Sequence, residues 1–588
     1  MTRPFLLIAG CAAALVGAVR LPSAPPSRPA VVPPAGDYAM FGGSPARNLV
    51  HPVPVALSHA FPVDPEDDKV RVLGRRVKWK ATLGSRAYGG PVVAGGRVYA
   101  GTNNENPRNP RDRAGSSSVG PAGEPLDKGV LMCFEEATGR FLWQMVHDKL
   151  ASGQVNDWPK EGVCSVPTVE HGRVYYMSNR CQVVCLDANG FADGNDGFQG
   201  EQYKTPTDGD VIWLNDLRAN YKVFPHNMAA GSPLIVGDRL FVVTGNGVDE
   251  NHITVPAPDA PSFVCLDKRT GRLLWSSNLP GKNIMHGQWS HPAYAVVGGK
   301  GQVIFAGGDG WLYAFEPDTG KLIWKFDANP KDSFYELGGR GTRSDFIGMP
   351  VIDRGRLYIG TGQDPEHFDG VGHFWCIDLD RRGDVSAEVL TDPALGPPAW
   401  RPNPNSAVVW HYGGEERRPF VRRDFVFGRT MSTAAVLDGV VYIADLAGYV
   451  HCLDAATGAK SWQWDTKSAV WGSPYAAGGK VLVATEDGDL FFFKHEKAPA
   501  RLDEAAAGSR AGLAALAAAF AAGGDGADCL RAGLAARDAA AAAVRERVKA
   551  KYLLQKVETG EPIRTTPIVA NGVLYVMTEK SMYAIQSK

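Results

Sequence analysis

The stretches that decide the fold are three copies of one pattern: FVCLDKRTGRLLW at residues 263–275, WLYAFEPDTGKLIW at 311–324 and YVHCLDAATGAKSW at 449–462. Each copy has a short apolar run, an acidic residue, a turn with Thr-Gly, and a second run that ends in tryptophan. Short runs separated by glycine-containing turns are typical of antiparallel β-strands. The pattern therefore predicts β-hairpins that recur along the chain.

A second motif precedes these hairpins and occurs eight times, each time at a turn. Its copies are GRVYAGT at 96, GRVYYMS at 172, DRLFVVT at 238, GQVIFAG at 301, GRLYIGT at 355, GVVYIAD at 439, GKVLVAT at 479 and GVLYVMT at 572. Four short strands per repeat make one blade, and blades bury their apolar faces only by stacking around a ring. We predict an all-β protein, an eight-bladed β-propeller of four-stranded antiparallel blades over residues 37–588.

The ends of the chain indicate how the ring closes. The last repeat stops at Tyr583-Ala584-Ile585 without a fourth strand, and a lone tryptophan strand, Val77–Lys80, precedes the first full repeat. We expect this N-terminal strand to complete the last blade, because pairing the ends hides two sheet edges. The tryptophans of the outer strands are expected to pack between blades, with each indole N–H on a neighbouring carbonyl. They are Trp143, Trp213, Trp275, Trp324, Trp410 and Trp462.

Residues 1–20 have the pattern of a signal peptide or membrane anchor, with Arg3 before an uncharged apolar run. Within this run Cys11 is a candidate for lipidation, and an apolar cysteine in an ordinary signal is the alternative. Residues 21–36 form a Pro-rich linker. We expect export to the periplasm or cell envelope, with peripheral or lipid-anchored membrane contact. The net charge of -1 gives no pull toward nucleic acid.

An insert at 495–551 interrupts the seventh blade. It is rich in alanine on both sides of Gly523-Gly524, which predicts a small helical hairpin. Most cysteines occupy one repeated strand position and are expected to be core residues. Cys164 and Cys181 fall outside that position, in loops on one face of a blade, and are candidates for a disulfide in an oxidising compartment.

The loop that leads into the first strand of each blade, here called its leading loop, is expected at one mouth of the central channel. Long loops at 103–128, 246–261 and 363–372 lie on the same face. The spacing in 363–372 fits no standard metal motif, so we predict no metal site. The candidate binding residues in the leading loops are His226, Asn227, His286, Gln288, Trp289, Arg340, Arg343, Arg429, Trp471 and Arg564, with Asp345 as the candidate base.

Arginine forks suit carboxylates and indole faces suit a planar ring, so these residues favour an anionic aromatic ligand such as a quinone. Ordinary turn chemistry, in which the same side chains bond only to neighbouring loops, is the alternative.

The Thr-Gly repeats, the segment MFGGSPARN at 40–48 and the split last blade resemble the pyrroloquinoline-quinone-like (PQQ-like) propellers. This superfamily includes quinoprotein alcohol dehydrogenases and the propeller lipoprotein of the outer-membrane barrel-assembly machinery. The resemblance covers roughly residues 37–588. The segment LPGKNIMHGQWSHPAY at 279–294 is also similar to exported bacterial propellers of this kind.

The resemblance implies two functions and leaves the question of an enzyme open, because this fold serves enzymes and scaffolds alike. One is a binding scaffold that takes a small anionic or polyol ligand, or an envelope protein, on its loop-rich channel face. The alternative is a PQQ- and calcium-dependent dehydrogenase of an alcohol or sugar. The adjacent cysteine pair of many family dehydrogenases is absent. No catalytic residue can therefore be carried over, and we place the scaffold first. We expect a monomer.

Overall fold

The computed structural model describes residues 36–115, 121–334, 336–337, 341–362, 366, 370–391, 399–415, 425–497 and 502–587. All of them fall within one compact unit, Pro33–Lys588. The predicted leader with Cys11, the linker up to residue 35, and Arg340 lie outside the described residues.

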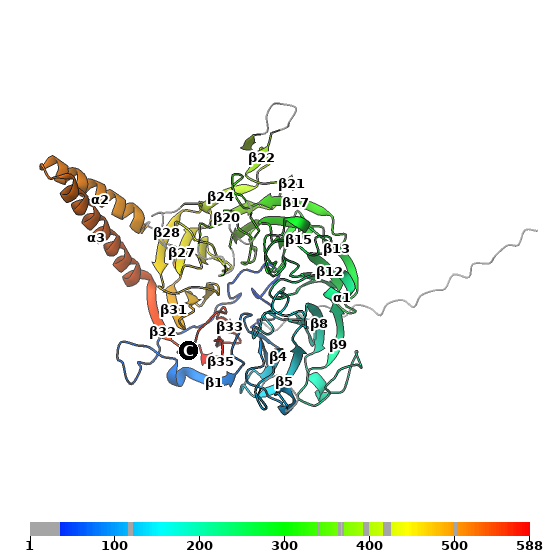
Figure 1. The fold of residues 1–588 in the computed structure, drawn as a ribbon. Helices are drawn as coiled ribbons and strands as arrows, with labels where there is room; N and C mark the ends of the chain where they lie inside the picture. The colour runs from blue at the N-terminus through cyan, green and yellow to red at the C-terminus, as the bar shows by residue number, and fades with distance from the viewer. Residues whose placement is uncertain are drawn as a thin grey trace, which may run out of the picture. The chain divides into compact units, whose positions relative to one another are not determined.

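Eight four-stranded antiparallel sheets surround a central channel, which confirms the predicted all-β propeller (Figure 1). The first four blades contain β2 (Val92–Ala94), β3 (Arg97–Asn103), β4 (Lys128–Glu135) and β5 (Phe141–Asp148); β6 (Thr168–Glu170), β7 (Arg173–Met177), β8 (Gln182–Asp187) and β9 (Val211–Asp216); β10 (Leu234–Val236), β11 (Arg239–Val243), β12 (Phe263–Asp267) and β13 (Leu273–Ser277); and β14 (Ala293–Val297), β15 (Lys300–Ala306), β16 (Trp311–Phe315) and β17 (Leu322–Asp327).

The other four contain β18 (Val351–Asp353), β19 (Arg356–Gly360), β20 (His373–Asp378) and β24 (Val408–Gly413); β25 (Ala435–Leu437), β26 (Val440–Ala444), β27 (Tyr449–Asp454) and β28 (Lys460–Asp465); β29 (Tyr475–Ala477), β30 (Lys480–Ala484), β31 (Asp489–Lys494) and β32 (Leu553–Glu558); and β33 (Ile568–Ala570), β34 (Val573–Met577), β35 (Ser581–Gln586) and β1 (Val77–Thr82). The short strand β21 (Gly383–Asp384) adds to the fourth blade by pairing in parallel with β17, and β22 (Glu388–Leu390) and β23 (Trp400–Pro402) form a separate two-stranded sheet.

The ring closes as predicted. The last sheet has the order β1-β35-β34-β33, so the N-terminal strand supplies the outer edge of the C-terminal blade. Trp79 of β1 pairs with Ala584, and its Nε1 donates to the Glu136 oxygen of the first blade at 2.9 Å. The first and last blades are thus joined by the same contact that joins neighbours elsewhere.

That contact is the docking of each outer-strand indole on the turn of the next blade. Trp275 Nε1 donates to the Pro317 oxygen at 2.8 Å, and Trp213 Nε1 donates to the Lys268 oxygen at 3.1 Å. Gly271 in the Thr-Gly turn has a φ of +69°, and a Cβ there would lie 2.4 Å from Trp213. The turn needs glycine because the backbone is left-handed and because the indole occupies the place of a side chain.

Two indoles depart from this pattern where the next blade lacks the Thr-Gly turn. Trp324 Nε1 donates to Gln302 Oε1 at 2.7 Å, and Gln302 Nε2 in turn donates to the main-chain oxygen of Leu379 in the fifth blade. Trp462 faces the seventh blade, whose turn is replaced by the helical insert, and stacks on Tyr552 with ring centroids 5.2 Å apart.

The N-terminal segment 36–51, here called the channel segment, runs around the inside of the ring. Its main chain bonds to the inner strands of successive blades, for example Tyr38 with Val93 of β2 and Pro45 with Tyr294 of β14. Its other main-chain partners are Asn571, Val169, Ile352 and Ala476, and the side chains of Arg47 and Asn48 reach Pro233 of the third blade and Val436 of the sixth, so every blade is reached. The fully buried Arg47 donates to the oxygens of Phe41, Pro233 and Pro292 at 2.8–3.2 Å.

The insert of the seventh blade forms a helical hairpin of α2 (Glu504–Ala521) and α3 (Gly526–Tyr552), which connects β31 to β32 (Figure 1). Its base is anchored, because Val544, Val548 and Tyr552 are buried against the ring. Its tip is exposed, with Phe520 at 72%. The shorter helix α1 (Leu217–Tyr221) follows β9. None of the helices in the described part of the chain combines the length and apolarity needed to cross a bilayer.

The predicted Cys164–Cys181 disulfide is not formed in the structure, where both residues are free thiols. Cys181 is fully buried between the second and third blades, and its Sγ donates to the Thr244 oxygen at 3.2 Å. Cys164 packs instead with Ala230 and Trp289 at the channel mouth. The two loops share a face, but their cysteine side chains enter different parts of the core.

Candidate functional site

A cavity of about 280 Å³ opens at the channel mouth. All eight leading loops contribute to its wall, together with Phe41 of the channel segment. The residues from the leading loops are Tyr88, Gly89, Gly90, Cys164, Val166, Asn227, Met228, Ala230, Trp289, His291, Ile347, Met349, Met431, Trp471, Gly472, Ser473, Arg564 and Thr566. The wall is therefore mostly apolar and aromatic, which is typical of small-molecule sites.

One sector of the wall combines aromatic rings with an arginine. Tyr88 and Trp471 lie with ring centroids 5.8 Å apart, and the Arg564 guanidinium lies 4.6 Å from the Trp471 centroid. Both terminal nitrogens of Arg564 are engaged by carboxylates, Nη2 with Glu486 at 2.6 Å and Nη1 with Glu579. The charge of Arg564 is thus balanced within the protein and does not make the cavity cationic.

Glu161 supplies a carboxyl group to the same wall. Burial raises the pKa of Glu161, while a hydrogen bond from the Tyr88 hydroxyl acts in the opposite direction. Its Oε2 is buried and has no hydrogen-bond partner within the described residues, and the same holds for Trp471 Nε1. Buried polar atoms are nearly always paired. Two residues of the wall therefore each carry a buried polar atom without a partner among the described residues.

Four of the predicted residues line this cavity: Asn227, Trp289, Trp471 and Arg564. Four others lie in the surrounding wall and hold the loops together. Gln288 donates to the Asn246 oxygen at 2.9 Å, and Arg429 Nε donates to Ser344 Oγ at 3.2 Å. Asp345 is 1% exposed and its carbonyl accepts from Gly362 at 2.9 Å.

Arg343 is the fourth of these wall residues. Its Nη2 donates to the Asp327 carboxylate at 2.5 Å, and its Nε donates to the main-chain oxygen of Asp309 at 2.9 Å. The described arginines of the leading loops therefore do not converge on one ligand site. The side chains of Arg429 and Arg343 bond to residues of the protein, among them Ser344 and Asp327.

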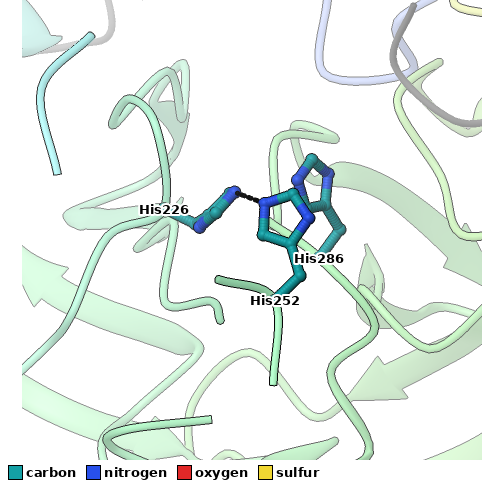
Figure 2. Close-up of side chains that lie close together, drawn as sticks. All are labelled: His226, His252 and His286. Carbon is teal, nitrogen blue, oxygen red and sulfur yellow. Dashed lines mark hydrogen bonds between the residues drawn. The ribbon is translucent and has the colours of Figure 1, made fainter. Parts of the chain in front are cut away.

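The remaining two predicted residues, His226 and His286, meet a third histidine that the sequence analysis did not select. His252 comes from the long loop between β11 and β12, and Figure 2 shows the three imidazole rings facing one another. Their nearest ligand atoms all lie within 4.8 Å of one another. This histidine cluster adjoins the cavity, because the rings of His286 and the cavity residue Trp289 are 5.3 Å apart.

Sequence reasoning also missed the cavity residues Tyr88, Trp158 and Glu161, and it interpreted Glu366 as part of a solvated acidic loop. Tyr88 stands in the first leading loop, so its aromatic side chain was the available signal. Trp158 and Glu161 precede the second leading loop and carry no repeat signal of their own.

The described wall of the cavity is a poor match for calcium-bound PQQ. That cofactor is a polycarboxylate, and calcium takes about six to eight oxygen ligands. The described cavity wall supplies the carboxylates of Glu161 and Glu366 and only one arginine, already paired with Glu486 and Glu579. This donor set does not fit an anionic quinone with its calcium ion.

An eight-bladed ring with tryptophan-docked blades and a closing N-terminal strand defines the class of PQQ-like β-propellers. A family model described as outer membrane protein assembly factor BamB matches residues 203–385 and 381–588, which is more than half of the chain. The chain belongs to this family.

Characterised relatives include quinoprotein dehydrogenases. The quinohemoprotein alcohol dehydrogenase ADH IIB of Pseudomonas putida is 28% identical over 260 residues, which is 38% of this chain and 32% of that protein. The dehydrogenase subunit of the alcohol dehydrogenase (quinone) of Gluconobacter oxydans (strain 621H) is 30% identical over 155 residues, 26% of this chain and 17% of that protein. The chain thus matches at most about a third of the length of these relatives.

Solved structures with this fold include a europium-containing methanol dehydrogenase, with 13% identity and a TM-score of 0.49 over 92% of this chain and 89% of that one. BamB from Moraxella catarrhalis has 13% identity and a TM-score of 0.40 over 78% of this chain and 88% of that one.

Proposed function

We propose that this protein is a binding scaffold of the cell envelope, whose channel-mouth cavity receives a small, largely apolar group that carries a hydrogen-bond donor. The group belongs to a free ligand or to a side chain of an envelope protein. The observation that carries the proposal is that one cavity is lined by the neighbouring aromatic rings of Tyr88 and Trp471 and by the carboxyl-bearing residue Glu161.

The electrostatics of the wall favour a cationic or neutral group over an anion. Glu161 and Glu366 line the cavity as carboxyl groups, whereas Arg564 is paired with two glutamates. A buried carboxylate gains most from a partner that donates to it with positive charge. This preference departs from the anionic ligand that the sequence favours.

Three probes with one ring and different charge test the proposal: benzylamine, benzyl alcohol and benzoate. Calorimetric titration of the full chain should show benzylamine binding most tightly, benzyl alcohol next and benzoate least. Glu161→Gln should weaken benzylamine at least about tenfold, because a hydrogen bond between charged partners is lost. Glu124→Gln, on the exposed 121–127 loop, is the matched control and should change nothing.

A preference for benzoate, or no heat from any probe, would contradict the proposal. Titration of PQQ with and without calcium tests the alternative dehydrogenase, which the quinoprotein relatives favour. Calcium-dependent PQQ binding to the full chain would support that alternative and justify a dye-reduction screen with alcohols and sugars.

The envelope location rests on the export pattern of residues 1–20 and on the description of the family model. Fractionation of cells that produce the full chain should place it outside the cytoplasm. Cys11→Ser should release it from the membrane fraction if a lipid on Cys11 anchors it. Retention of the full chain in the cytoplasm would refute the location.

A further inference from the structure

We propose that His226, His252 and His286 form a binding site for a divalent transition-metal ion of the class that prefers imidazole, with Zn²⁺ as its reference ion. Three neutral imidazoles are a common protein ligand set for zinc, with a fourth position left for a carboxylate or water. The site is separate from the proposed ligand role of the cavity and is tested independently of it.

The first argument is the spacing of the nitrogens. Zinc–nitrogen bonds are about 2.0–2.1 Å long, so two ligands of a tetrahedral ion lie roughly 3.3 Å apart. His226 Nε2 and His252 Nε2 are 3.1 Å apart, and the nearest ligand atoms of all three residues lie within 4.8 Å (Figure 2). Closing a separation of 4.8 Å to that spacing takes an approach of roughly 1.5 Å, which rotation of the third side chain can supply.

The second argument is the orientation of His226. Its Nδ1 lies 2.8 Å from the Val248 oxygen. A carbonyl only accepts, so Nδ1 carries the proton and Nε2 presents its lone pair to the cluster. Histidines that bind metals almost always donate their other ring N–H in this way, which fixes the tautomer and the ring.

The third argument is that the main chain holds two of the loops in place. Val248, whose oxygen orients His226, also donates its N–H to the His286 oxygen at 3.0 Å. At Gly247 the chain passes so closely that a Cβ would lie 2.5 Å from both the His226 Cβ and the His286 oxygen. The rings are therefore preorganised by a close crossing of main chains, which lowers the cost of ordering them around an ion.

A carboxylate lies next to the cluster on the cavity side. Glu366 Oε2 is 3.9 Å from His286 Nε2, and Glu366 lines the cavity. A bound ion would thus join the third, fourth and fifth blades through their mouth loops, and its remaining position would face a carboxylate. Calcium is not expected there, because it requires oxygen ligands.

The test uses the full chain, purified without a polyhistidine tag, stripped with chelator and titrated with Zn²⁺. We expect about one tightly bound ion per chain and, with Co²⁺, the visible absorption of a tetrahedral site. His252→Ala should weaken Zn²⁺ binding at least about tenfold, since the loss of even an outer partner costs roughly 10- to 100-fold. Calcium should produce no heat that depends on His252.

His171→Asn is the matched control, because His171 is an exposed hairpin histidine with a φ of +51° that asparagine tolerates. Circular dichroism checks that each variant is folded, and His252→Gln replaces His252→Ala if the latter is not. No zinc uptake by the wild type, or equal uptake by the His252 and His171 variants, would overturn the proposal and leave a purely hydrogen-bonded cluster.

Discussion

Arg343 shows what decides the role of a side chain at the scale of a single residue. Its loop reaches the channel mouth, yet its guanidinium bonds to Asp327, whose side chain is 3% exposed and is also held by Lys331 at 2.6 Å. A leading loop therefore places a residue near the cavity, whereas the position of the nearest buried opposite charge determines which group its side chain pairs with. Here that charge belongs to Asp327, which ends β17, the strand directly before the loop, 16 residues from Arg343.

Arg343→Ala should lower stability and leave ligand binding intact. Removing one partner from a buried ion pair typically costs about 3–5 kcal/mol. Thermal denaturation of Arg343→Ala, compared with the exposed Arg381→Ala, should show the loss only in the first variant. Benzylamine should bind both folded proteins as it binds the wild type. Weaker binding by Arg343→Ala alone would assign this residue to the ligand site after all.

Asp309, whose main-chain oxygen accepts from Arg343, should make the stability of the fold depend on pH. Burial raises the pKa of Asp309 to about 7, although the Tyr313 hydroxyl donates to it at 2.7 Å. The folded protein keeps this proton up to about pH 7, whereas the unfolded chain loses it near pH 4. The stability that Asp309 contributes is therefore complete below about pH 4 and falls as the pH rises to about 7.

Asp309→Asn cannot ionise, so its stability should decline less between pH 4.5 and 7.5. The difference from the wild type should reach at most ~4 kcal/mol, the equivalent of about three pKa units. Urea denaturation at several pH values measures it. The exposed Asp538→Asn on α3 serves as the comparison and should follow the wild type. Parallel curves for Asp309→Asn and the wild type would show that Asp309 is ionised when folded.

At the scale of strands and turns, the contact between an outer-strand indole and the turn of the next blade explains why the fold could be predicted so fully. An indole, a Thr-Gly turn and an acidic residue recur in sequence because the same contact recurs in space, as for Trp213 and Trp275. The blade count, the closing strand and the inserted hairpin all follow from such local patterns. The histidine cluster does not follow from such a pattern, because His252 lies in a loop that is not repeated in the other blades. The length of that loop indicated only that it reaches the channel face.

Two glycine variants test this contact between indole and turn. Gly271→Ala places a Cβ in a left-handed backbone and 2.4 Å from Trp213, whereas Gly172→Ala has the same backbone strain at φ +73° but meets nothing within 4 Å. We expect Gly172→Ala to cost about 1–2 kcal/mol and Gly271→Ala roughly 1–3 kcal/mol more. Equal losses by chemical denaturation would mean that the indole moves aside without cost.

The helical hairpin separates into an anchored base and a free tip. Tyr552 is fully buried and stacks on Trp462, while Leu513 and Phe520 are 69% and 72% exposed. Tyr552→Ala should cost about 3–5 kcal/mol, in the range of large aromatic truncations. Leu513→Ala should leave the melting temperature almost unchanged. Similar melting of the two variants would show that Tyr552 is not part of the packing between the sixth and seventh blades.

At the scale of the whole molecule, the channel segment changes how the blades depend on one another. In most repeat proteins each repeat contacts only its neighbours, so stability propagates along one dimension. Here one segment bonds to the inner strands of all eight blades. The buried Arg47 ties the third and fourth blades to Phe41 in the wall of the cavity.

Arg47→Ala should therefore affect the entire ring. Three carbonyl oxygens lose a charged donor, at a cost of at least about 3 kcal/mol. We expect calorimetric unfolding to change from one transition to several, while the exposed Arg531→Ala retains the wild-type transition. A single transition at the wild-type temperature in Arg47→Ala would show that neighbour contacts alone make the ring cooperative.

The channel segment also fixes the size of the ring. Propellers diversify by gaining and losing blades, and a ring held only by neighbours can close again with a different number. Here the main chain of the segment meets the last, first, second, fourth, fifth and seventh blades in that order, from Asn571 through Val93 to Ala476, and the side chains of Arg47 and Asn48 reach the third and sixth. A duplicated blade would find no bonding position on this segment, and a deleted one would leave a position unused. The contacts of the channel segment therefore match a ring of eight blades and would not match a ring with more or fewer.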